Sequence, residues 1–153
     1  MNIVLVEPEI HWNTGNIGRT CVGTGTGLHL IGPLGFSLDA KEVRRAGLDY
    51  WEKVDLRVYA DWAGFEGSLP DGAPLLMFSA EAKREFWEAP YRSSSYLVFG
   101  KESTGLNPSL RKRYADRLYR IPHNTEIRSL NLSTAAGIVL YEALRATRGR
   151  AGP

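Results

Sequence analysis

The first hydrophobic segment of the chain, residues 3–6, is an uninterrupted apolar run that ends at Glu7 and Pro8. Such a run is typical of a strand that is buried on both faces of a sheet. Similar short apolar runs recur along the chain and predict further strands at 28–31, 54–59, 75–79, 96–100 and 117–121. Strands of this kind that alternate with helices form a mostly parallel sheet.

The helices are predicted from caps, glycines and apolar spacing between these runs. Asn13 or Thr14 is expected to cap a first helix, which Gly23, Gly25 and Gly27 close. Shorter helices are predicted at 41–45 after Asp39, at 61–67, at 82–87, and at 108–113 after Asn107.

The final helix has the clearest amphipathic pattern, because apolar residues between Leu132 and Ala143 recur every three or four positions. The chain as a whole therefore predicts an α/β fold, a mostly parallel sheet flanked by helices, in a single domain over residues 1–153. Residues 146–153, which end in RGRAGP, are expected to form a frayed tail.

Composition excludes several classes of protein. Cys21 is the one cysteine and the three histidines are scattered, so neither an internal disulfide nor a bound metal is expected. No apolar run approaches the roughly 20 residues of a membrane helix. The first residues, MNIVLVEPEI, lack the basic start of a signal peptide, so we expect a cytoplasmic protein with no membrane partner.

The charge is unevenly distributed along the chain. Residues 1–100 hold 9 Lys/Arg and 13 Asp/Glu, whereas residues 101–153 hold 10 Lys/Arg and 4 Asp/Glu. Most of the basic residues in the second part are arginines, which bind phosphate bidentately and stack on bases. This part of the chain is therefore either the contact surface for a polyanion or an ordinary solvated basic surface.

Common nucleotide and hydrolase motifs are absent from the sequence. The glycines at 23–27 follow a helix and precede a strand, the reverse of a dinucleotide-binding fingerprint. Residues 100–105 are not a phosphate-binding P-loop, because Ser95 stands where that motif needs glycine and Glu102 where it needs Ser or Thr. The chain also contains no GxSxG or HExxH sequence.

Two polar segments remain as candidate ligand sites. Residues 100–105 follow a buried strand, and ligands of parallel sheets bind at the carboxyl ends of strands. Residues 128–133 open the final helix with Ser129, Asn131 and Ser133, more short polar side chains than one cap requires. The alternatives are an ordinary turn for the first segment and redundant capping for the second.

Three segments together resemble the SPOUT family of RNA methyltransferases: NTGNIGRT at 13–20, LVFGKESTGL at 97–106 and IPHNTEIRSLNLSTA at 121–135. KEVRRAGLDYW at 41–51, in a chain without an added RNA-binding domain, is similar to the TrmL (YibK-like) branch. The resemblance implies an α/β-knot fold with a C-terminal trefoil knot, and a homodimer in which both subunits shape each site. It also implies 2′-O-methylation of the wobble nucleotide, cytidine or uridine 34, in the anticodon stem-loop of tRNA by S-adenosylmethionine.

The resemblance assigns residues as well. It implies that Arg19 and Asn13 are catalytic, and it implies a cofactor-binding set of Phe78, Gly100, Glu102, Ile121, Ser129, Leu130 and Asn131. For RNA, the candidates are Arg19, Arg128, Tyr141, Arg145 and Arg148, with core or dimer-interface packing as the alternative for Tyr141. The branch usually has proline after the residue that matches Ile10, whereas this chain has His11 and Trp12, in a loop expected to touch substrate.

The chemistry of methyl transfer limits what each of these residues can do. The enzyme must hold the ribose 2′-oxygen in line with the methyl carbon and help to remove its proton. Because arginine stays protonated, Arg19 is expected to clamp the target phosphate and stabilise the developing alkoxide, while the proton passes to phosphate or water. Phe78, Ile121 and Leu130 suit an adenine slot, and Glu102 could bind either the ribose or the cationic part of the cofactor. Two alternative functions remain: 2′-O-methylation of another RNA such as rRNA, and non-catalytic binding of RNA or a nucleotide.

Overall fold

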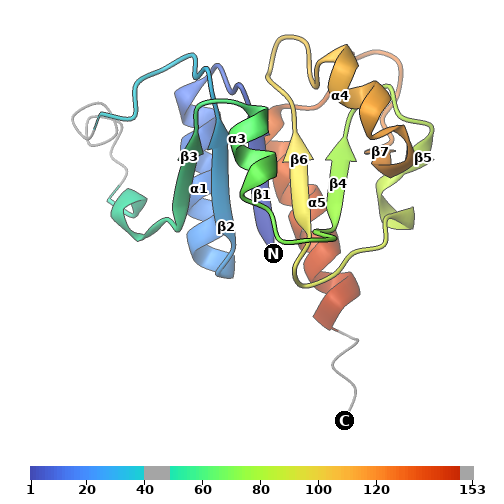
Figure 1. Ribbon diagram of the computed structural model, residues 1–153. Coiled ribbons are helices and arrows are strands. Elements are labelled where there is room, and N and C mark those ends of the chain that lie inside the picture. Colours follow the sequence, from blue (N-terminus) through green and yellow to red (C-terminus); the bar gives the residue numbers. More distant parts are fainter. Residues whose placement is uncertain (40–48, 149–153) are drawn as a thin grey trace.

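The computed structural model describes residues 1–39 and 49–148. Within them, seven strands form one sheet in the order β3-β2-β1-β6-β4-β7-β5 (Figure 1). All of the strand pairings are parallel. The strands are β1 (Asn2–Val6), β2 (Gly27–Ile31), β3 (Leu56–Tyr59), β4 (Leu75–Phe78), β5 (Arg84–Glu85), β6 (Tyr96–Phe99) and β7 (Leu118–Arg120). The helices are α1 (His11–Thr24), α3 (Trp62–Gly67), α4 (Pro108–Arg113) and α5 (Leu132–Arg148), with 3-10 turns η1 (Trp51–Lys53), η2 (Phe86–Glu88) and η3 (Ala115–Arg117).

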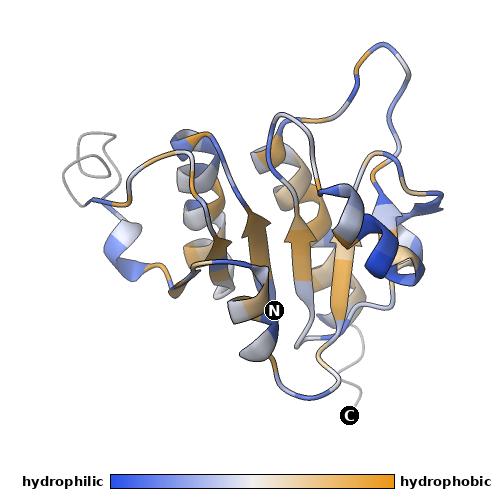
Figure 2. Cartoon of the chain, turned by 45° about the horizontal axis from the view of Figure 1, so that its top comes forward, coloured by the Kyte–Doolittle hydropathy of each residue, from blue (hydrophilic) through white to orange (hydrophobic). Residues whose placement is uncertain are grey.

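Helices cover both faces of this sheet, as the uninterrupted apolar strands predict. Along β1, Ile3 and Leu5 join the core cluster formed with α1 and α5. The alternate residues Val4 and Val6 join a second cluster, with α3 and α4. Figure 2 shows the apolar strands enclosed between these two layers. The predicted α/β class with a mostly parallel sheet is confirmed.

Several local predictions are confirmed by the hydrogen bonds at the helix ends. As predicted, Asn107 caps α4, and its side chain accepts from the Leu110 amide at 2.9 Å. The helix predicted at 61–67 is α3, and the structure adds its cap, because Asp61 accepts from the Gly64 amide at 2.8 Å. Helix α1 ends at Gly25, whose φ of 65° is in the left-handed region that glycine adopts without strain.

Three local predictions have a different outcome. The helix predicted at 82–87 is wrong: residues 84–85 form β5, which pairs with β7, and η2 follows. A distant strand edge supplies that pairing, so the local sequence does not reveal it. The frayed tail is wrong for residues 146–148, because α5 continues to Arg148. The helix predicted at 41–45, most of KEVRRAGLDYW and residues 149–153 lie outside the described residues.

The strand order brings together segments that are far apart in the sequence. Strand β6 pairs with both β1 and β4, although it follows β1 by about ninety residues. The segment after β1 therefore lies beside the segment after β6. The trefoil knot implied by the resemblance stays a prediction.

A buried histidine on the α3 side of the sheet links three strands. His29 is 3% exposed; its Nε2 lies 3.2 Å from Asn2 Oδ1 and its Nδ1 lies 3.1 Å from the Tyr59 hydroxyl. An amide oxygen only accepts, so Nε2 donates to Asn2 and Nδ1 accepts from Tyr59. Burial, followed by the nearby Arg57 charge, lowers the His29 pKa from 6.5 to about 4. The ring is therefore neutral in the folded protein at neutral pH.

This histidine is expected to make stability fall in acid. Between pH 6.5 and 4, the unfolded chain binds a proton at His29 and the folded chain does not. The free energy of unfolding is therefore at its full value above pH 6.5 and decreases as the pH falls toward 4. The expected loss between pH 7 and 4.5 is about 2.5 kcal/mol. Urea unfolding of wild type and His29→Gln at both pH values measures it, because glutamine keeps a donor and an acceptor but does not titrate. Equal losses in the two proteins would contradict the prediction.

Candidate functional site

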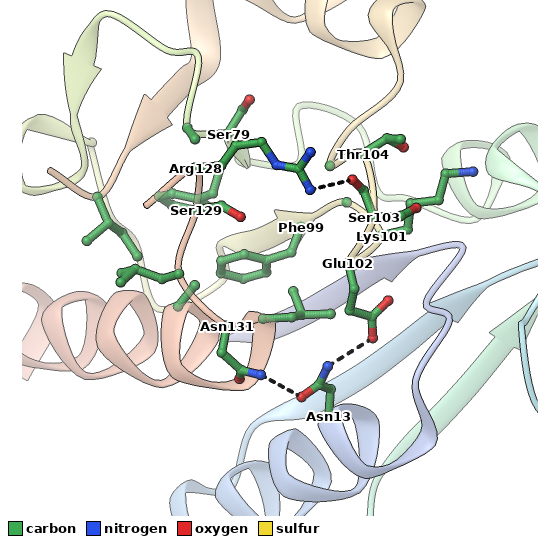
Figure 3. Close-up of a pocket in the computed structure, with 18 of the residues that line it drawn as sticks. Asn13, Ser79, Phe99, Lys101, Glu102, Ser103, Thr104, Arg128, Ser129 and Asn131 are labelled. Carbon is green, nitrogen blue, oxygen red and sulfur yellow. Dashed lines mark hydrogen bonds between the residues drawn. The ribbon is translucent and has the colours of Figure 1, made fainter. Parts of the chain in front are cut away.

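A cavity of about 630 Å³ lies at the carboxyl ends of β4, β6 and β7, beside the first turns of α1 and α5 (Figure 3). Parallel sheets bind their ligands at this edge, and the volume is in the range of small-molecule sites. All of the residues that the resemblance assigns to the cofactor line it: Phe78, Gly100, Glu102, Ile121, Ser129, Leu130 and Asn131. Asn13 and Arg128 line the same cavity.

Two stacked aromatic rings provide an apolar surface in the cavity. Phe78 ends β4 and Phe99 ends the neighbouring β6, and their ring centroids are 5.1 Å apart at an interplanar angle of 19°. Ile121 and Leu130 add aliphatic surface from the segments after β7 and before α5. Sequence reasoning missed Phe99, because its place at the end of a buried apolar run is also that of a core residue.

Glu102 caps helix α1 from a distant part of the chain. The N-cap of α1 is Ile10, which has no polar side chain, so the prediction that Asn13 or Thr14 caps this helix is wrong. Instead, the Glu102 carboxylate accepts from the Glu9 amide at 2.7 Å and the Ile10 amide at 3.1 Å. A carboxylate at a helix N-terminus satisfies free amides and interacts favourably with the helix dipole. Glu102 thereby fixes the start of α1 against the loop that follows β6.

Asn13 connects the three segments that carry the family resemblance, 13–20, 97–106 and 121–135 (Figure 3). Its Nδ2 donates to Glu102 at 3.2 Å, and its Oδ1 accepts from Asn131 Nδ2 at 3.0 Å. The side-chain oxygen of Asn131 caps α5, because it accepts from the backbone amides of Ser133 and Thr134 at 2.9 and 3.2 Å. The side chains of Glu102, Asn13 and Asn131 therefore form one hydrogen-bonded row across the cavity wall.

The loop after β6 is also held from its other side. Lys101 Nζ lies 3.0 Å from Glu7 Oε2. The Glu9 carboxylate accepts from both the amide and the hydroxyl of Ser103 at 2.8 Å, and these bonds, with the amide first, lower the Glu9 pKa. The Arg128 guanidinium donates to the Ser103 carbonyl oxygen at 3.3 Å. Sequence reasoning missed Glu7, Glu9 and Ser103, since only the pairing of β1 with β6 brings them together.

The fold of the loop after β6 requires glycine at position 100. A Cβ built at Gly100 would lie 2.0 Å from both the Gly105 carbonyl carbon and the Leu106 nitrogen. Gly100 also lines the cavity, but the packing of its own loop already excludes a side chain at this position. Without a side chain at position 100, the loop folds back tightly on the end of β6.

Arg19 lies away from the cavity of its own chain. It is exposed on α1 and is not among the residues that line the cavity. Its guanidinium carbon lies 5.6 Å from the centroid of the Tyr50 ring, and the Tyr50 hydroxyl donates to the Gly15 carbonyl oxygen at 2.8 Å. Tyr50 therefore stacks against the outer side of α1 and supports Arg19 there.

The other RNA candidates are distributed over the surface. Arg128 lies at the cavity, whereas Tyr141 is on α5 and 61% exposed, which excludes core packing within the chain as its role. Arg145 is bound to Glu142 of the same helix by two hydrogen bonds of 2.8 and 2.7 Å. Arg148 is exposed at the end of α5.

The described residues 1–39 and 49–148 contain no group of three or more His, Cys, Asp or Glu side chains placed to hold a metal ion. Cys21 is a buried residue of α1, and burial raises the pKa of its thiol to about 12. In the same part of the chain, no helix combines the length and the apolar character needed to cross a membrane.

Comparison with known proteins agrees with this site. The model of the SpoU rRNA Methylase family matches residues 1–141. A tRNA (cytidine(34)-2'-O)-methyltransferase from Burkholderia pseudomallei is 45% identical over 146 residues, which cover 94% of each chain. A structure solved for "the 2-OH methylation of C/U34 on tRNA" superposes with a TM-score of 0.91 at 45% identity, over 97% of each chain. An AdoMet-bound rRNA methyltransferase from Sinorhizobium meliloti gives a TM-score of 0.81 at 27% identity, over 95% of this chain and 56% of that one.

The resemblance to SPOUT RNA methyltransferases is therefore confirmed. The family match includes the sheet and the three segments 13–20, 97–106 and 121–135, each of which contributes residues to the cavity wall. The chain is a methyltransferase and belongs to the SpoU rRNA methylase family.

Proposed function

We propose that this protein transfers a methyl group from S-adenosylmethionine to the ribose 2′-hydroxyl of cytidine or uridine 34 of tRNA. The observation that carries the proposal is that all seven residues assigned to the cofactor line one cavity. The choice of substrate rests on the relative from Burkholderia pseudomallei, which shares 45% of its residues over 94% of both chains.

The cavity fits this cofactor in size and lining. Phe78, Ile121 and Leu130 would hold the adenine in the apolar part, with Phe99 stacked behind Phe78. Ser129 supplies a hydroxyl for a polar contact. The carboxylate of Glu102 keeps its two bonds to the start of α1, so we assign it a positioning role instead of direct binding. When bound, the cofactor supplies an electrophilic methyl group.

We assign the row of Glu102, Asn13 and Asn131 to the alignment of the site. It joins the first turn of α1, the loop after β6 and the cap of α5 by direct hydrogen bonds. A shift of any one of the three would move the others, and methyl transfer requires close alignment of the attacking oxygen. Asn13 thus acts as a positioning residue, in place of the direct catalytic role that the resemblance implies.

We propose that Arg19 acts in the site of a partner subunit. It is exposed and lies outside the cavity of its own chain, as expected of a residue that acts on the site of a second copy. There it would bind the phosphate of the target nucleotide and stabilise negative charge on the 2′-oxygen. The proton of the hydroxyl passes to that phosphate or to water, since arginine itself does not deprotonate.

The remaining assignments complete this proposal. The protein works as a single-domain homodimer in the cytoplasm, with the anticodon stem-loop of tRNA as its partner. Arg128 at the cavity, with Tyr141, Arg145 and Arg148 on α5, would contact the RNA. Arg145 has to exchange its bonds with Glu142 for a phosphate, so its contribution is expected to be smaller than that of Arg128.

Mass spectrometry of RNA from cells with and without the gene tests this function. We expect 2′-O-methylated nucleotide 34 in tRNA to disappear on deletion, while ribosomal RNA stays unchanged, and purified protein to restore the mark with S-adenosylmethionine. Loss of a methyl group from ribosomal RNA alone would instead assign the protein to that substrate. A protein that binds no S-adenosylmethionine in calorimetry would be a non-catalytic RNA-binding module.

A further inference from the structure

Three aromatic rings gather at the start of α1, outside the cavity. Trp12 is 65% exposed, the largest exposed fraction among the large hydrophobic side chains of the described residues. The His11 ring centroid lies 4.2 Å from that of Trp12 at an angle of 49°, and 6.3 Å from that of Phe36. Nothing else described for this protein accounts for an exposed tryptophan at this place.

The rings are held by two fixed segments. The loop that carries Phe36 bonds to the segment before α1, because the Gly35 amide donates to the Pro8 carbonyl oxygen at 2.9 Å. A Cβ at Gly35 would lie 2.7 Å from Glu9 Cα, so only glycine permits this contact. The start of α1 is in turn held by Glu102. The aromatic group is therefore built on a preorganised part of the site.

The rings lie next to the reaction cavity. Ile10 and Asn13, on either side of the pair His11 and Trp12, both line the cavity. An RNA that places one ribose in the cavity must carry its neighbouring nucleotides over the surrounding surface. The first turn of α1 is part of that surface.

The surroundings of Trp12 favour a nucleobase over an apolar protein surface. Asn16, one turn further along α1, is exposed, and the nearby Glu9 carboxylate is occupied by Ser103. An exposed flat ring with polar side chains beside it suits a flat partner with a polar edge. Single-stranded RNA offers such partners, because its bases turn out of the stack and pack on aromatic side chains.

We propose that Trp12, supported by His11 and Phe36, is a stacking platform for a base of the substrate RNA next to the methylated nucleotide. This inference rests on the proposed function and names the part of the chain that recognises the unpaired loop. Stacking tolerates different bases, so the platform selects single-stranded over paired RNA and does not select a particular base.

Methylation kinetics of Trp12→Ala, Trp12→Phe and the control Trp87→Ala test the platform. Trp87 is comparably exposed, at 53%, but lies in η2, after the edge strand β5, and does not line the cavity. We expect Trp12→Ala to raise the KM for tRNA about tenfold or more, the effect of one lost base stack, with kcat changed less than about threefold. Trp12→Phe keeps a ring and is expected to stay within about threefold of wild type, and Trp87→Ala within about twofold.

An unchanged KM for Trp12→Ala would overturn the inference. So would sedimentation showing that Trp12→Ala is a monomer where wild type is a dimer, because the rings would then belong to a contact between copies. Quenching of tryptophan fluorescence by single-stranded oligocytidylate gives a readout independent of catalysis. Wild type and Trp87→Phe should be quenched and Trp12→Phe should not; quenching of Trp12→Phe equal to wild type would refute the platform. If wild type methylates no tRNA, the proposed function fails while this binding test still decides on the platform.

Discussion

Replacing Arg19 with alanine is expected to reduce methyl transfer to tRNA at least about 100-fold, the usual effect of removing a group that stabilises developing negative charge. The affinity for S-adenosylmethionine should change less than about fivefold, because Arg19 does not line the cavity of its own chain. Turnover assays and calorimetry measure the two effects. Arg92→Ala is the matched control, since Arg92 is also exposed and lies before β6, at the opposite end of the strands. Near-normal turnover of Arg19→Ala would refute the assignment, and full activity of Arg19→Lys would refute a bidentate clamp.

Mixed dimers decide which subunit uses Arg19. We would unfold and refold Arg19→Ala together with Ile121→Arg, whose new cation in the cavity should repel the cationic cofactor. If Arg19 acts in the partner's site, each mixed dimer contains one complete site, and an equal mixture should recover about one quarter of wild-type activity. If Arg19 acts in its own site, every site lacks one component and the mixture stays inactive.

The second large effect is expected for Gly100→Ala. The new Cβ would lie 2.0 Å from backbone atoms of Gly105 and Leu106, a distance that only a shift of the loop relieves. We expect the free energy of unfolding to fall by about 3 kcal/mol, as for severe overpacking. Because Gly100 and the loop that follows it line the cavity, cofactor affinity should fall at least about 30-fold. Urea unfolding and calorimetry with S-adenosylmethionine measure the two effects.

Alanine substitutions at two other glycines serve as controls for the steric clash at Gly100. Gly23 lies within α1 with nothing within 4 Å of a built Cβ, so Gly23→Ala should be neutral or stabilise the protein by about 0.5–1 kcal/mol. Gly105 has the same open space but a φ of 69°, so Gly105→Ala should cost about 1 kcal/mol from backbone strain alone. Wild-type cofactor affinity in Gly100→Ala would show that the loop adapts, and would contradict the prediction.

The predictions from sequence were most accurate where neighbouring residues determine the structure. The apolar runs located the main strands, and Asn107 was found as a cap because a cap bonds amides two or three residues away. The prediction of a helix at 82–87 was wrong, because β5 forms there by pairing with the edge of β7. Asn13 was misread as a cap for a similar reason, since its partners Glu102 and Asn131 are 89 and 118 residues distant.

The sequence by itself determined the α/β class, the order of its main elements and, through three short segments, the family. It also predicted a set of cofactor residues, which all line one cavity. Only the tertiary structure decided what several of these residues do. Glu102 holds the start of α1, 92 and 93 residues earlier in the chain, because β6 pairs with β1. Asn13 bridges two loops, and Arg19 lies outside the cavity of its own chain. The physical reason is that each of these roles depends on contacts between residues that are distant in the sequence, and only the pairing of the strands brings these residues together.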